Sequence, residues 1–282
     1  MQTQWQVSRS TIDLSRPQVM GIVNTTPDSF SDGGRHNSAS AALQHAELLL
    51  SQGADILDIG GESTRPGSPA VPLEQELQRV LPVVKEAVRW QVPISVDTYK
   101  PEVMQAVLEL GADIINDIWA LRQPGARELI AAHGSCGVCL MHMHQTPQTM
   151  QLQHMEGDAV PEVKTFLQQQ LAQLQAMGVE SRRLVLDYGI GFGKSVEQNF
   201  ALLARQQELR ALGLPLLAGW SRKGSLGKVT GCAVEDRLVP SVTAAVLAVE
   251  RGARIVRVHD VAATVAALKV WGAMQAQIAV TA

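Results

Sequence analysis

The stretch Arg183-Leu-Val-Leu-Asp-Tyr-Gly-Ile-Gly-Phe-Gly-Lys194 shows how this chain is built. Its apolar run from Leu184 to Leu186 has the length of a buried strand, and the carboxylate of Asp187 follows where that strand stops. The alternate glycines after it allow backbone angles that are closed to other residues, so the chain can approach a ligand closely. Because strand ends are common places for chemistry in α/β proteins, we expect a functional site beside Asp187.

Two familiar phosphate-binding motifs do not fit these glycines. The P-loop pattern requires a glycine where this chain has Tyr188. The dinucleotide fingerprint requires a third glycine at the position of Lys194. The loop is therefore of another kind.

Short apolar runs of the same type recur along the chain. They are rich in Val and Ile and too short for helices, and they cover residues 19–23, 56–59, 94–96, 114–115, 138–141, 184–186, 216–218 and 255–258. Longer amphipathic stretches separate them, at residues 39–51, 73–90, 101–110, 125–133, 160–177, 196–212, 240–251 and 261–274. Strands that alternate with helices pair in parallel, and this number of units predicts a closed (β/α)8 TIM barrel. A doubly wound open sheet is the alternative.

The ends of the predicted helices support this division. Gly53, Gly111 and Gly252 each stand between a helix and the next strand, where a left-handed cap residue belongs. No proline- or glycine-rich linker interrupts the series, so residues 1–282 are predicted to form a single domain. Residues 1–17 alternate between polar and apolar and predict a short N-terminal β-hairpin that closes the bottom of the barrel.

Composition excludes several classes of partner. A net charge of −3 argues against a general nucleic-acid surface, and no run approaches the roughly 18 apolar residues of a membrane helix. Three cysteines cannot all pair, which favours a reduced, cytoplasmic setting. The pair Cys136-Gly-Val-Cys139 lies in a predicted strand, so we expect packing there and no redox or metal role.

Polar side chains follow nearly every predicted strand. In a barrel of this kind the loops after the strands build the active site, and the opposite ends carry little except cap glycines. In chain order the strand ends carry Asn24, residues 60–65, Asp97, Asn116, residues 141–144, Asp187, residues 221–223 and residues 257–259.

The acidic and amide members of this set suit one kind of ligand. Asp97, Asn116 and Asp187 can read a heterocycle that offers adjacent N–H donors and a carbonyl. A lone aspartate near a strand end is also often a helix cap. This interpretation is harder to apply to three polar residues at strand ends than to one. Asp58 is left open, as a core or sheet position.

The cationic members point to an anionic group on the same ligand. Arg65, Lys223, Arg257 and His259 supply donors for a phosphate or diphosphate. Asn24 offers a hard oxygen to Mg²⁺, which keeps most of its waters and meets substrate phosphates. Together they predict a site for a polar heterocycle joined to a mono- or diphosphate.

Two histidines near this site favour a structural interpretation. His142 and His144 alternate with Met141 and Met143, so only one face of the strand reaches the mouth. No third ligand stands at a spacing typical of zinc, which favours a satisfied buried histidine over a metal ligand.

Motifs in the same order along almost the whole chain resemble those of dihydropteroate synthases, the pterin-binding barrels of folate biosynthesis. The matching stretches are Met20-Gly-Ile-Val-Asn-Thr-Thr-Pro-Asp-Ser-Phe-Ser-Asp-Gly-Gly34, Asp58-Ile-Gly-Gly-Glu-Ser-Thr-Arg-Pro-Gly67, Ser95-Val-Asp-Thr98, Ile114-Ile-Asn-Asp-Ile118, Cys139-Leu-Met-His-Met143, residues 187–194, Ser221-Arg-Lys223 and Arg257-Val-His259. Such a set is far more specific than any single motif.

The resemblance implies a transferase that condenses 6-hydroxymethyl-7,8-dihydropterin diphosphate with 4-aminobenzoate. It implies that the pterin is bound by Asp97, Asn116, Met141, Asp187 and Lys223. It implies that the diphosphate is bound by Asn24 (through Mg²⁺), Arg65, Arg257 and His259. It implies that the aminobenzoate lies by Thr64, Gly191, Phe192, Ser221, Arg222 and Lys223. The residues expected to act in catalysis are Asp97, Asp187, Lys223, Arg257 and His259.

The resemblance further implies Mg²⁺ as cofactor, a homodimer through the late helices, sensitivity to sulfonamides, and loops at 25–35 and 62–68 that close over the site. Three residues depart from the family pattern: Tyr99, Tyr188 and Gly224. Two rival functions share the pterin pocket, a pterin-dependent methyltransferase and a non-catalytic pterin-binding paralogue. The phosphate-facing cations argue against the methyltransferase.

Overall fold

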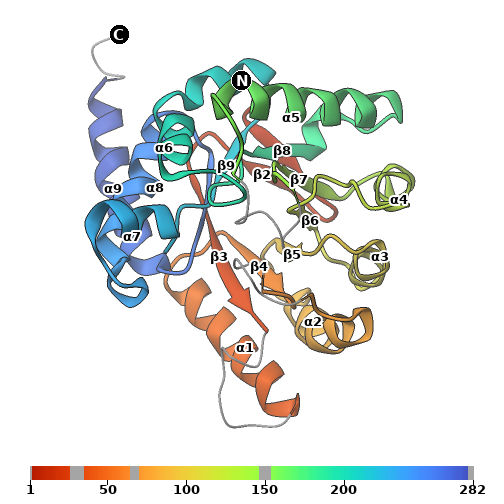
Figure 1. The fold of residues 1–282 in the computed structure, drawn as a ribbon. Coiled ribbons are helices and arrows are strands. Elements are labelled where there is room, and N and C mark those ends of the chain that lie inside the picture. The colour runs from red at the N-terminus through yellow and green to blue at the C-terminus, as the bar shows by residue number, and fades with distance from the viewer. Residues whose placement is uncertain (1, 26–34, 64–69, 146–153, 279–282) are drawn as a thin grey trace.

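The structure, a computed structural model, describes residues 2–25, 35–63, 70–145 and 154–278. A closed barrel of parallel strands forms its centre, so the predicted TIM barrel is confirmed and the open sheet is wrong (Figure 1). The strands are β3 (Gln18–Asn24), β4 (Ile56–Gly60), β5 (Ile94–Asp97), β6 (Ile114–Asp117), β7 (Gly137–Met141), β8 (Leu184–Asp187), β9 (Leu216–Ala218) and β10 (Ile255–Val258).

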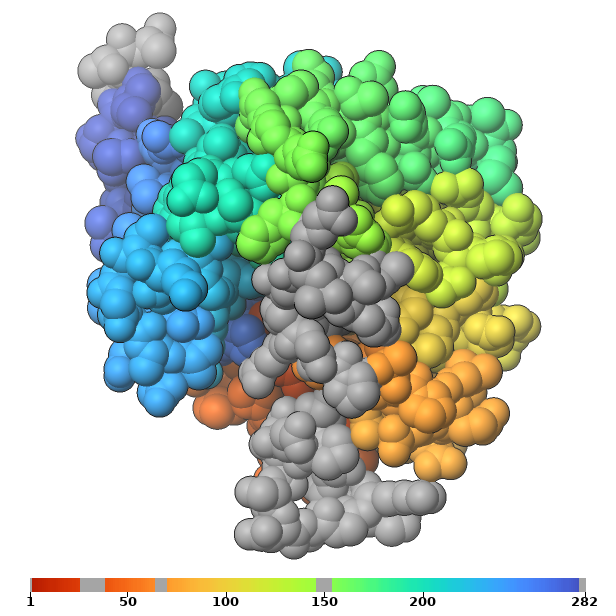
Figure 2. All heavy atoms as spheres, viewed as in Figure 1, coloured from red at the N-terminus to blue at the C-terminus, as the bar shows by residue number. Residues whose placement is uncertain are grey.

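Helices surround the barrel in chain order, as the run of colours around the ring shows (Figures 1 and 2). They are α1 (Arg35–Ser51), α2 (Leu73–Ala87), α3 (Pro101–Glu109), α4 (Ala126–His133), α5 (Ala159–Ala176), α6 (Val196–Ala204), α7 (Gly224–Thr230), α8 (Leu238–Glu250) and α9 (Val261–Ile278). Short 3-10 turns cover Ser181–Arg183, Gln206–Leu212 and Val234–Asp236. Helix α7 is absent from the pattern of predicted helices, because it is only two turns long and contains two glycines.

The register of the strands brings the predicted site residues to one level. Neighbouring Cα positions in the ladder pair Asn24 with Gly60, Gly60 with Asp97, and Asp97 with Asn116. Side chains alternate between the two faces of a strand, so residues in register share a face. The polar ends of adjacent strands therefore lie side by side at the carboxyl end of the barrel.

An apolar layer fills the opposite end. The hairpin strands β1 (Gln4–Gln6) and β2 (Thr11–Asp13) pair antiparallel, as predicted. Trp5, Val7, Ile12 and Leu14 of this hairpin region form one buried cluster with residues from the barrel strands, namely Met20, Ile56, Ile114, Cys139, Val185, Leu217 and Ile255. The hairpin thus covers the lowest inward-facing layer of the barrel.

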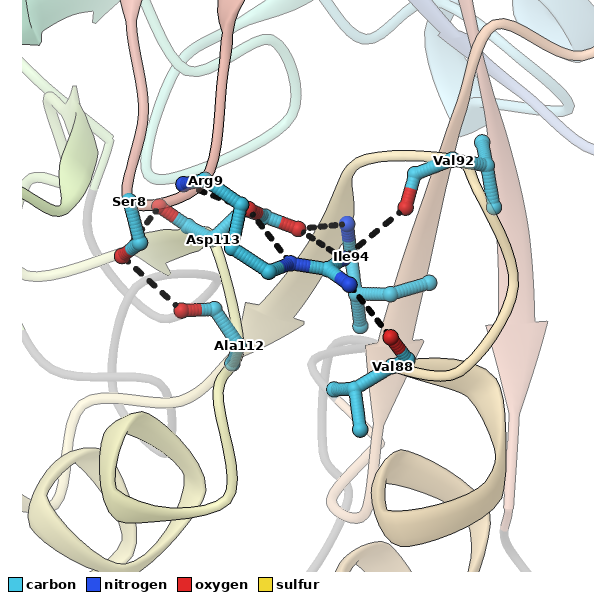
Figure 3. Close-up of polar contacts among 7 residues, drawn as sticks. All are labelled: Ser8, Arg9, Val88, Val92, Ile94, Ala112 and Asp113. Carbon is cyan, nitrogen blue, oxygen red and sulfur yellow. Dashed lines mark hydrogen bonds and ion pairs between the residues drawn. The ribbon is translucent and has the colours of Figure 1, made fainter.

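An ion pair fastens this hairpin to the barrel (Figure 3). The Arg9 guanidinium donates to Asp113 Oδ1 at 3.0 Å and to the carbonyl of Val92 at 3.1 Å, and it also contacts Val88 O. Asp113 Oδ2 accepts a hydrogen bond from Ile94 N at 2.8 Å. Asp113 therefore links the hairpin to two neighbouring strands.

The packing predicted for the two cysteines of the Cys136–Cys139 pair is confirmed. Cys136 and Cys139 are free and buried, the first in the layer between barrel and helices, the second inside the barrel. Among the helices that the structure describes, none combines the length and the apolar character that a membrane crossing requires.

Candidate active site

The floor of the barrel mouth is a buried carboxylate, Asp58. It lies two residues after Ile56 and has the same inward direction. It accepts hydrogen bonds from Ser95 Oγ at 2.6 Å, Asn116 Nδ2 at 3.1 Å and Arg257 Nε at 2.6 Å. From the sequence, Asp58 could be a core or a sheet position. It stands two residues after Ile56, however, and residues two apart in a strand point to the same side.

Arg257 joins two of the floor carboxylates. Its Nη2 donates to Asp97 Oδ2 at 2.7 Å while its Nε donates to Asp58. These carboxylates raise the pKa of the guanidinium although burial opposes them. Arg257 was expected at the diphosphate, and the structure places its guanidinium between Asp58 and Asp97.

Asp97 is incompletely paired. Its Oδ2 accepts from Arg257, whereas its buried Oδ1 has no hydrogen-bond partner among the described residues. Burial raises the pKa of Asp97 to about 7, Arg257 opposes this, and the charge of Asp58 adds to it. A buried polar atom without a partner is costly, so Oδ1 is suited to a donor from a ligand.

Asp187 occupies the end of β8, as predicted. Its Oδ1 accepts a hydrogen bond from Gly189 N at 2.7 Å. Burial raises the pKa of Asp187, and the Gly189 hydrogen bond followed by Lys223, Lys194 and Arg257 opposes the rise. This carboxylate therefore faces several cations without a direct ion pair among the described residues.

Lys223 stands across the mouth at the N-cap of α7. Its Nζ lies 4.3 Å from the centroid of the Phe192 ring. Burial lowers the pKa of Lys223 to about 8, with the charge of Arg257 adding to this and Asp187 and Asp97 opposing it. The lysine is thus a cation that the mouth holds between an aromatic ring and carboxylates.

An apolar wall completes the mouth. Its buried members are Ile118, Met141, Met143 and Phe192, with Tyr99 and Trp119 packed against them. Tyr99 and Trp119 meet edge to face at 5.6 Å between ring centroids. A wall of this kind beside a polar floor suits a flat heterocycle whose edge is polar.

Trp119 owes its position to Asp117, a carboxylate outside the predicted set of site residues. Asp117 is buried and accepts hydrogen bonds from Trp119 N at 2.6 Å and Leu121 N at 2.8 Å. Between them the chain turns with positive φ at Ala120 and Leu121, which residues other than glycine adopt rarely. Burial raises the pKa of Asp117 to about 7, and those two hydrogen bonds oppose it.

The glycine-rich loop after β8 is braced from α6. Asn199 Oδ1 accepts from Gly191 N at 2.9 Å, and Asn199 Nδ2 donates to Ser225 Oγ at 3.0 Å. Ser225, the residue after the departure at Gly224, is therefore engaged with Asn199. Gly189 has φ +67, and a side chain there would meet His142 O at 1.9 Å, so the close approach requires glycine.

Tyr188 points away from the mouth. Its hydroxyl donates to Gln206 Oε1 at 2.8 Å and accepts from Trp220 Nε1 at 3.4 Å. Gln206 in turn donates to Ala248 O at 3.0 Å. This departure from the family pattern therefore belongs to the packing between barrel and helices.

The last two strand ends place their residues differently. Ser221 Oγ lies 3.0 Å from His259 Nδ1 and accepts from His259 N at 3.1 Å, so these two residues form one unit. Arg222 instead turns to Asp260, with Nη2 to Oδ1 at 2.6 Å. The structure brings Ser221 and His259 together and leaves Arg222 on the outer side.

The predicted metal ligand lies at the end of β3. Asn24 is half-buried and shares its level with Asp97. Within the described ranges no group of three or more His, Cys, Asp or Glu side chains is arranged to hold a metal ion. The donor set fits an ion that takes one oxygen from the protein and the others from water and a phosphorylated ligand, as Mg²⁺ does.

Thr64 and Arg65 lie outside the described residues, as do most of the loops at 25–35 and 62–68. The chain leading to the second loop is anchored at Glu62. Its carboxylate accepts from Tyr99 Oη at 3.0 Å and pairs with Lys100, which also contacts Glu76. Tyr99 thus contacts both this anchor and the apolar wall.

His142 is buried, as predicted, but not all of its ring nitrogens have a hydrogen-bond partner among the described residues. Its ring meets Phe166 edge to face at 4.9 Å between centroids. Its Nδ1 has no hydrogen-bond partner among the described residues. Burial followed by the charge of Lys194 lowers the pKa of the imidazole, so the ring is neutral.

The chain is similar to known proteins over almost its whole length. A family model described as pterin binding enzyme matches residues 20–259. The dihydropteroate synthase of Neisseria meningitidis serogroup B is 51% identical over 276 residues, covering 96% of this chain and 97% of that protein. The enzyme of the same name from Escherichia coli K12 is 50% identical over 262 residues, 93% of each chain.

Solved structures are also similar to this chain over nearly its whole length. A dihydropteroate synthase of Xanthomonas albilineans with 4-aminobenzoic acid superposes with a TM-score of 0.92 at 50% identity, over 98% of this chain and 99% of that one. A dihydropteroate synthase of Burkholderia cenocepacia, complexed with 7,8-dihydropteroate, superposes with a TM-score of 0.90 at 48% identity, over 98% of both chains.

Proposed function

The chain belongs to the pterin-binding enzyme family, among the dihydropteroate synthases, and from this membership and the geometry of the mouth we propose how it works. It is a transferase that condenses 6-hydroxymethyl-7,8-dihydropterin diphosphate with 4-aminobenzoate, which yields 7,8-dihydropteroate and diphosphate. The observation that carries the mechanism is the set of buried, incompletely paired carboxylates at the carboxyl ends of the strands.

The floor of the mouth binds the pterin edge. Asp97 Oδ1 and the carboxylate of Asp187 accept hydrogen bonds from ring N–H groups, while Asn116 is held in place by Asp58. The apolar wall around Met141 and Phe192 covers a face of the ring. Because ionised carboxylates accept stronger hydrogen bonds than neutral acceptors, this edge-on recognition is both tight and selective.

The same carboxylates promote bond breaking. As diphosphate departs, positive charge develops on the pterin methylene group, and Asp97 and Asp187 stabilise it electrostatically. Their surroundings are buried, so the interaction is stronger than it would be in water. The neutral arylamine then attacks the methylene carbon, and no strong general base is needed.

The cations serve the leaving group and the acceptor. Lys223, the Ser221–His259 pair and Arg65 bind the negative charge of the diphosphate or of the aminobenzoate carboxylate. On substrate binding, Arg257 exchanges one of its two carboxylate contacts for the ligand. Arg222 joins the acceptor site by leaving Asp260, and Thr64, Gly191 and Phe192 shape the pocket of the acceptor.

Asn24 would hold Mg²⁺ through its side-chain oxygen. When bound, the ion would supply positive charge opposite the charge of the diphosphate. Asn24 fits this role because it lies in register with Gly60 beside Asp97, at the level of the mouth.

Release of diphosphate tests the proposal. Purified chain is mixed with pterin diphosphate, 4-aminobenzoate and Mg²⁺, and each component is omitted in turn. Release that requires all three supports the synthase. Binding of the pterin without release would instead indicate a non-catalytic paralogue. Sulfonamides should compete with 4-aminobenzoate in the same assay.

Exposed apolar side chains on the late helices support a homodimer. Val239 and Val270 are 72% and 73% exposed, and Leu247, Met274 and Ile278 are also exposed. These residues belong to α8 and α9, which pack side by side at one edge of the ring (Figure 1). Light scattering should give twice the chain mass of 30.4 kDa, and Val239→Asp with Val270→Asp should halve it.

A further inference from the structure

Lys194, at the end of the glycine-rich loop, has an ammonium group inside the protein. The residue is only 3% exposed. Its Nζ donates to three main-chain carbonyls, those of Gly189 at 2.8 Å, Phe192 at 3.2 Å and His142 at 3.4 Å. Burying a charged group away from water costs free energy unless that group is well solvated by the protein, so this arrangement needs a reason.

The three carbonyls come from the ends of two neighbouring strands. His142 directly follows β7, whereas Gly189 and Phe192 belong to the loop after β8. Phe192 forms part of the apolar wall and lies under Lys223. One ammonium group thus joins the end of β7 to the loop that presents Phe192.

The same group is linked to Asp187 through a single residue, Gly189. Lys194 Nζ donates to the carbonyl of Gly189, and the N–H of Gly189 donates to Asp187 Oδ1. None of the ion pairs in the described part of the chain involves Lys194. The charged and titratable groups that act on this pair are Lys223, Arg257, His142, Cys139 and Tyr188.

We propose that Lys194 is a positioning residue for the reaction, which fixes the loop carrying Phe192 and supplies, beside Lys223 and Arg257, one of the buried positive charges that keep Asp187 ionised. The inference rests on the proposed function, because an ionised Asp187 matters only to an enzyme that binds the pterin and its cation there.

The titration behaviour of the two groups agrees with this geometry. Burial lowers the pKa of Lys194 to about 7, Asp187 opposes that change, and Lys223 adds to it. Below that pH the lysine carries its proton, so its positive charge is available to Asp187. Removing an opposite charge at close range raises the pKa of a carboxyl group by about one to three units.

Carbon-13 NMR titration of the aspartate carboxyl groups measures this directly. The signal of Asp187 is assigned by its absence in Asp187→Asn. In Lys194→Met we expect the midpoint of Asp187 to rise by about one to three pH units. At pH values below both midpoints, kcat/KM for pterin diphosphate should fall by about tenfold for each unit of that rise.

Asn199→Ala is the matched control, because Asn199 braces the same loop without a charge. It contacts Gly191 N, Lys194 O and Ser225 Oγ. This variant should lower kcat/KM and leave the midpoint of Asp187 where the wild type has it. If both variants move the midpoint equally, or if neither does, the inference is wrong.

A reciprocal measurement covers the case in which Lys194→Met does not fold. Coupling between two sites is equal in both directions, so Asp187→Asn must lower the midpoint of Lys194. Carbon-13 NMR at lysine Cε reports that midpoint, and an unchanged value contradicts the inference. If the wild type releases no diphosphate, the proposed function fails, whereas a working wild type with uncoupled midpoints overturns the inference alone.

Discussion

Each end of the barrel buries an aspartate, and the two aspartates differ in how completely their oxygens are hydrogen-bonded. Asp113, at the hairpin end, is 1% exposed and accepts hydrogen bonds from Arg9 and Ile94 through both oxygens. Asp97, at the mouth, is 6% exposed and shares Arg257 with Asp58, and its Oδ1 has no partner among the described residues. Burial raises the pKa of Asp97 to about 7, with Arg257 opposing.

This difference separates stability from chemistry. A carboxylate whose oxygens are paired within the protein holds elements together and has nothing to offer a ligand. A carboxylate that is buried and incompletely paired destabilises the empty protein and awaits donors from a substrate. The hairpin end therefore carries packing and pairing, and the mouth carries the reaction.

The largest expected effect is at the mouth. Asp187→Asn keeps the size of the side chain and removes the charge that stabilises the developing cation, so kcat should fall by about 10²- to 10³-fold. Steady-state release of diphosphate measures the loss, and circular dichroism verifies that the fold is retained. Wild-type turnover in this variant would show that the mouth does not depend on Asp187.

At the hairpin end, Asp113→Ala should lower the stability of the protein and leave its turnover unchanged. The change leaves Ile94 N and the main-chain N–H of Arg9 without their acceptor, which costs about 2–3 kcal/mol in the free energy of unfolding. Urea denaturation measures the loss, while kcat of the folded fraction should stay unchanged. Glu86→Ala, which removes an exposed carboxylate paired with Arg89, is the control and should stay within about 0.5 kcal/mol.

A smaller effect is expected one residue from Asp187. Tyr188→Phe removes the buried hydroxyl that joins Gln206 and Trp220, so the free energy of unfolding should fall by about 1 kcal/mol. KM for both substrates should not change, because this side chain faces the helices. A tenfold change in KM for 4-aminobenzoate would place Tyr188 at the mouth after all.

Much of this division is visible in the sequence. The eight apolar runs and the cap glycines specify the barrel, because helix and strand periods differ and neither depends on distant contacts. The strand-end rule then places Asp97, Asn116 and Asp187 at one mouth. The register pairs Asp97 with Asn116, and it pairs Asp187 with Met141 at the end of β7. Neighbouring strands fix the level of each end residue.

Side-chain pairing cannot be obtained in that way. Arg257 on β10 reaches past β3 to Asp58 on β4, and these residues are 199 positions apart in the chain. Arg222 turns outward because Asp260 lies beside it, which no local pattern reveals. The role of Lys194 depends on three carbonyls, and carbonyls are present at every residue and leave no mark in a sequence.

Asp97→Asn tests the central claim most directly, through thermal unfolding and turnover measured on the same samples. The pKa of Asp97 is raised in the folded chain, so its contribution to stability is intact below the unfolded pKa and is lost as the pH rises through about 7. The asparagine avoids that loss. The variant should therefore be more stable than the wild type by on the order of 1–3 kcal/mol near pH 8, with the gain vanishing toward about pH 4 and turnover lost. A variant that is less stable than the wild type at pH 8, or that turns over normally, would contradict the account.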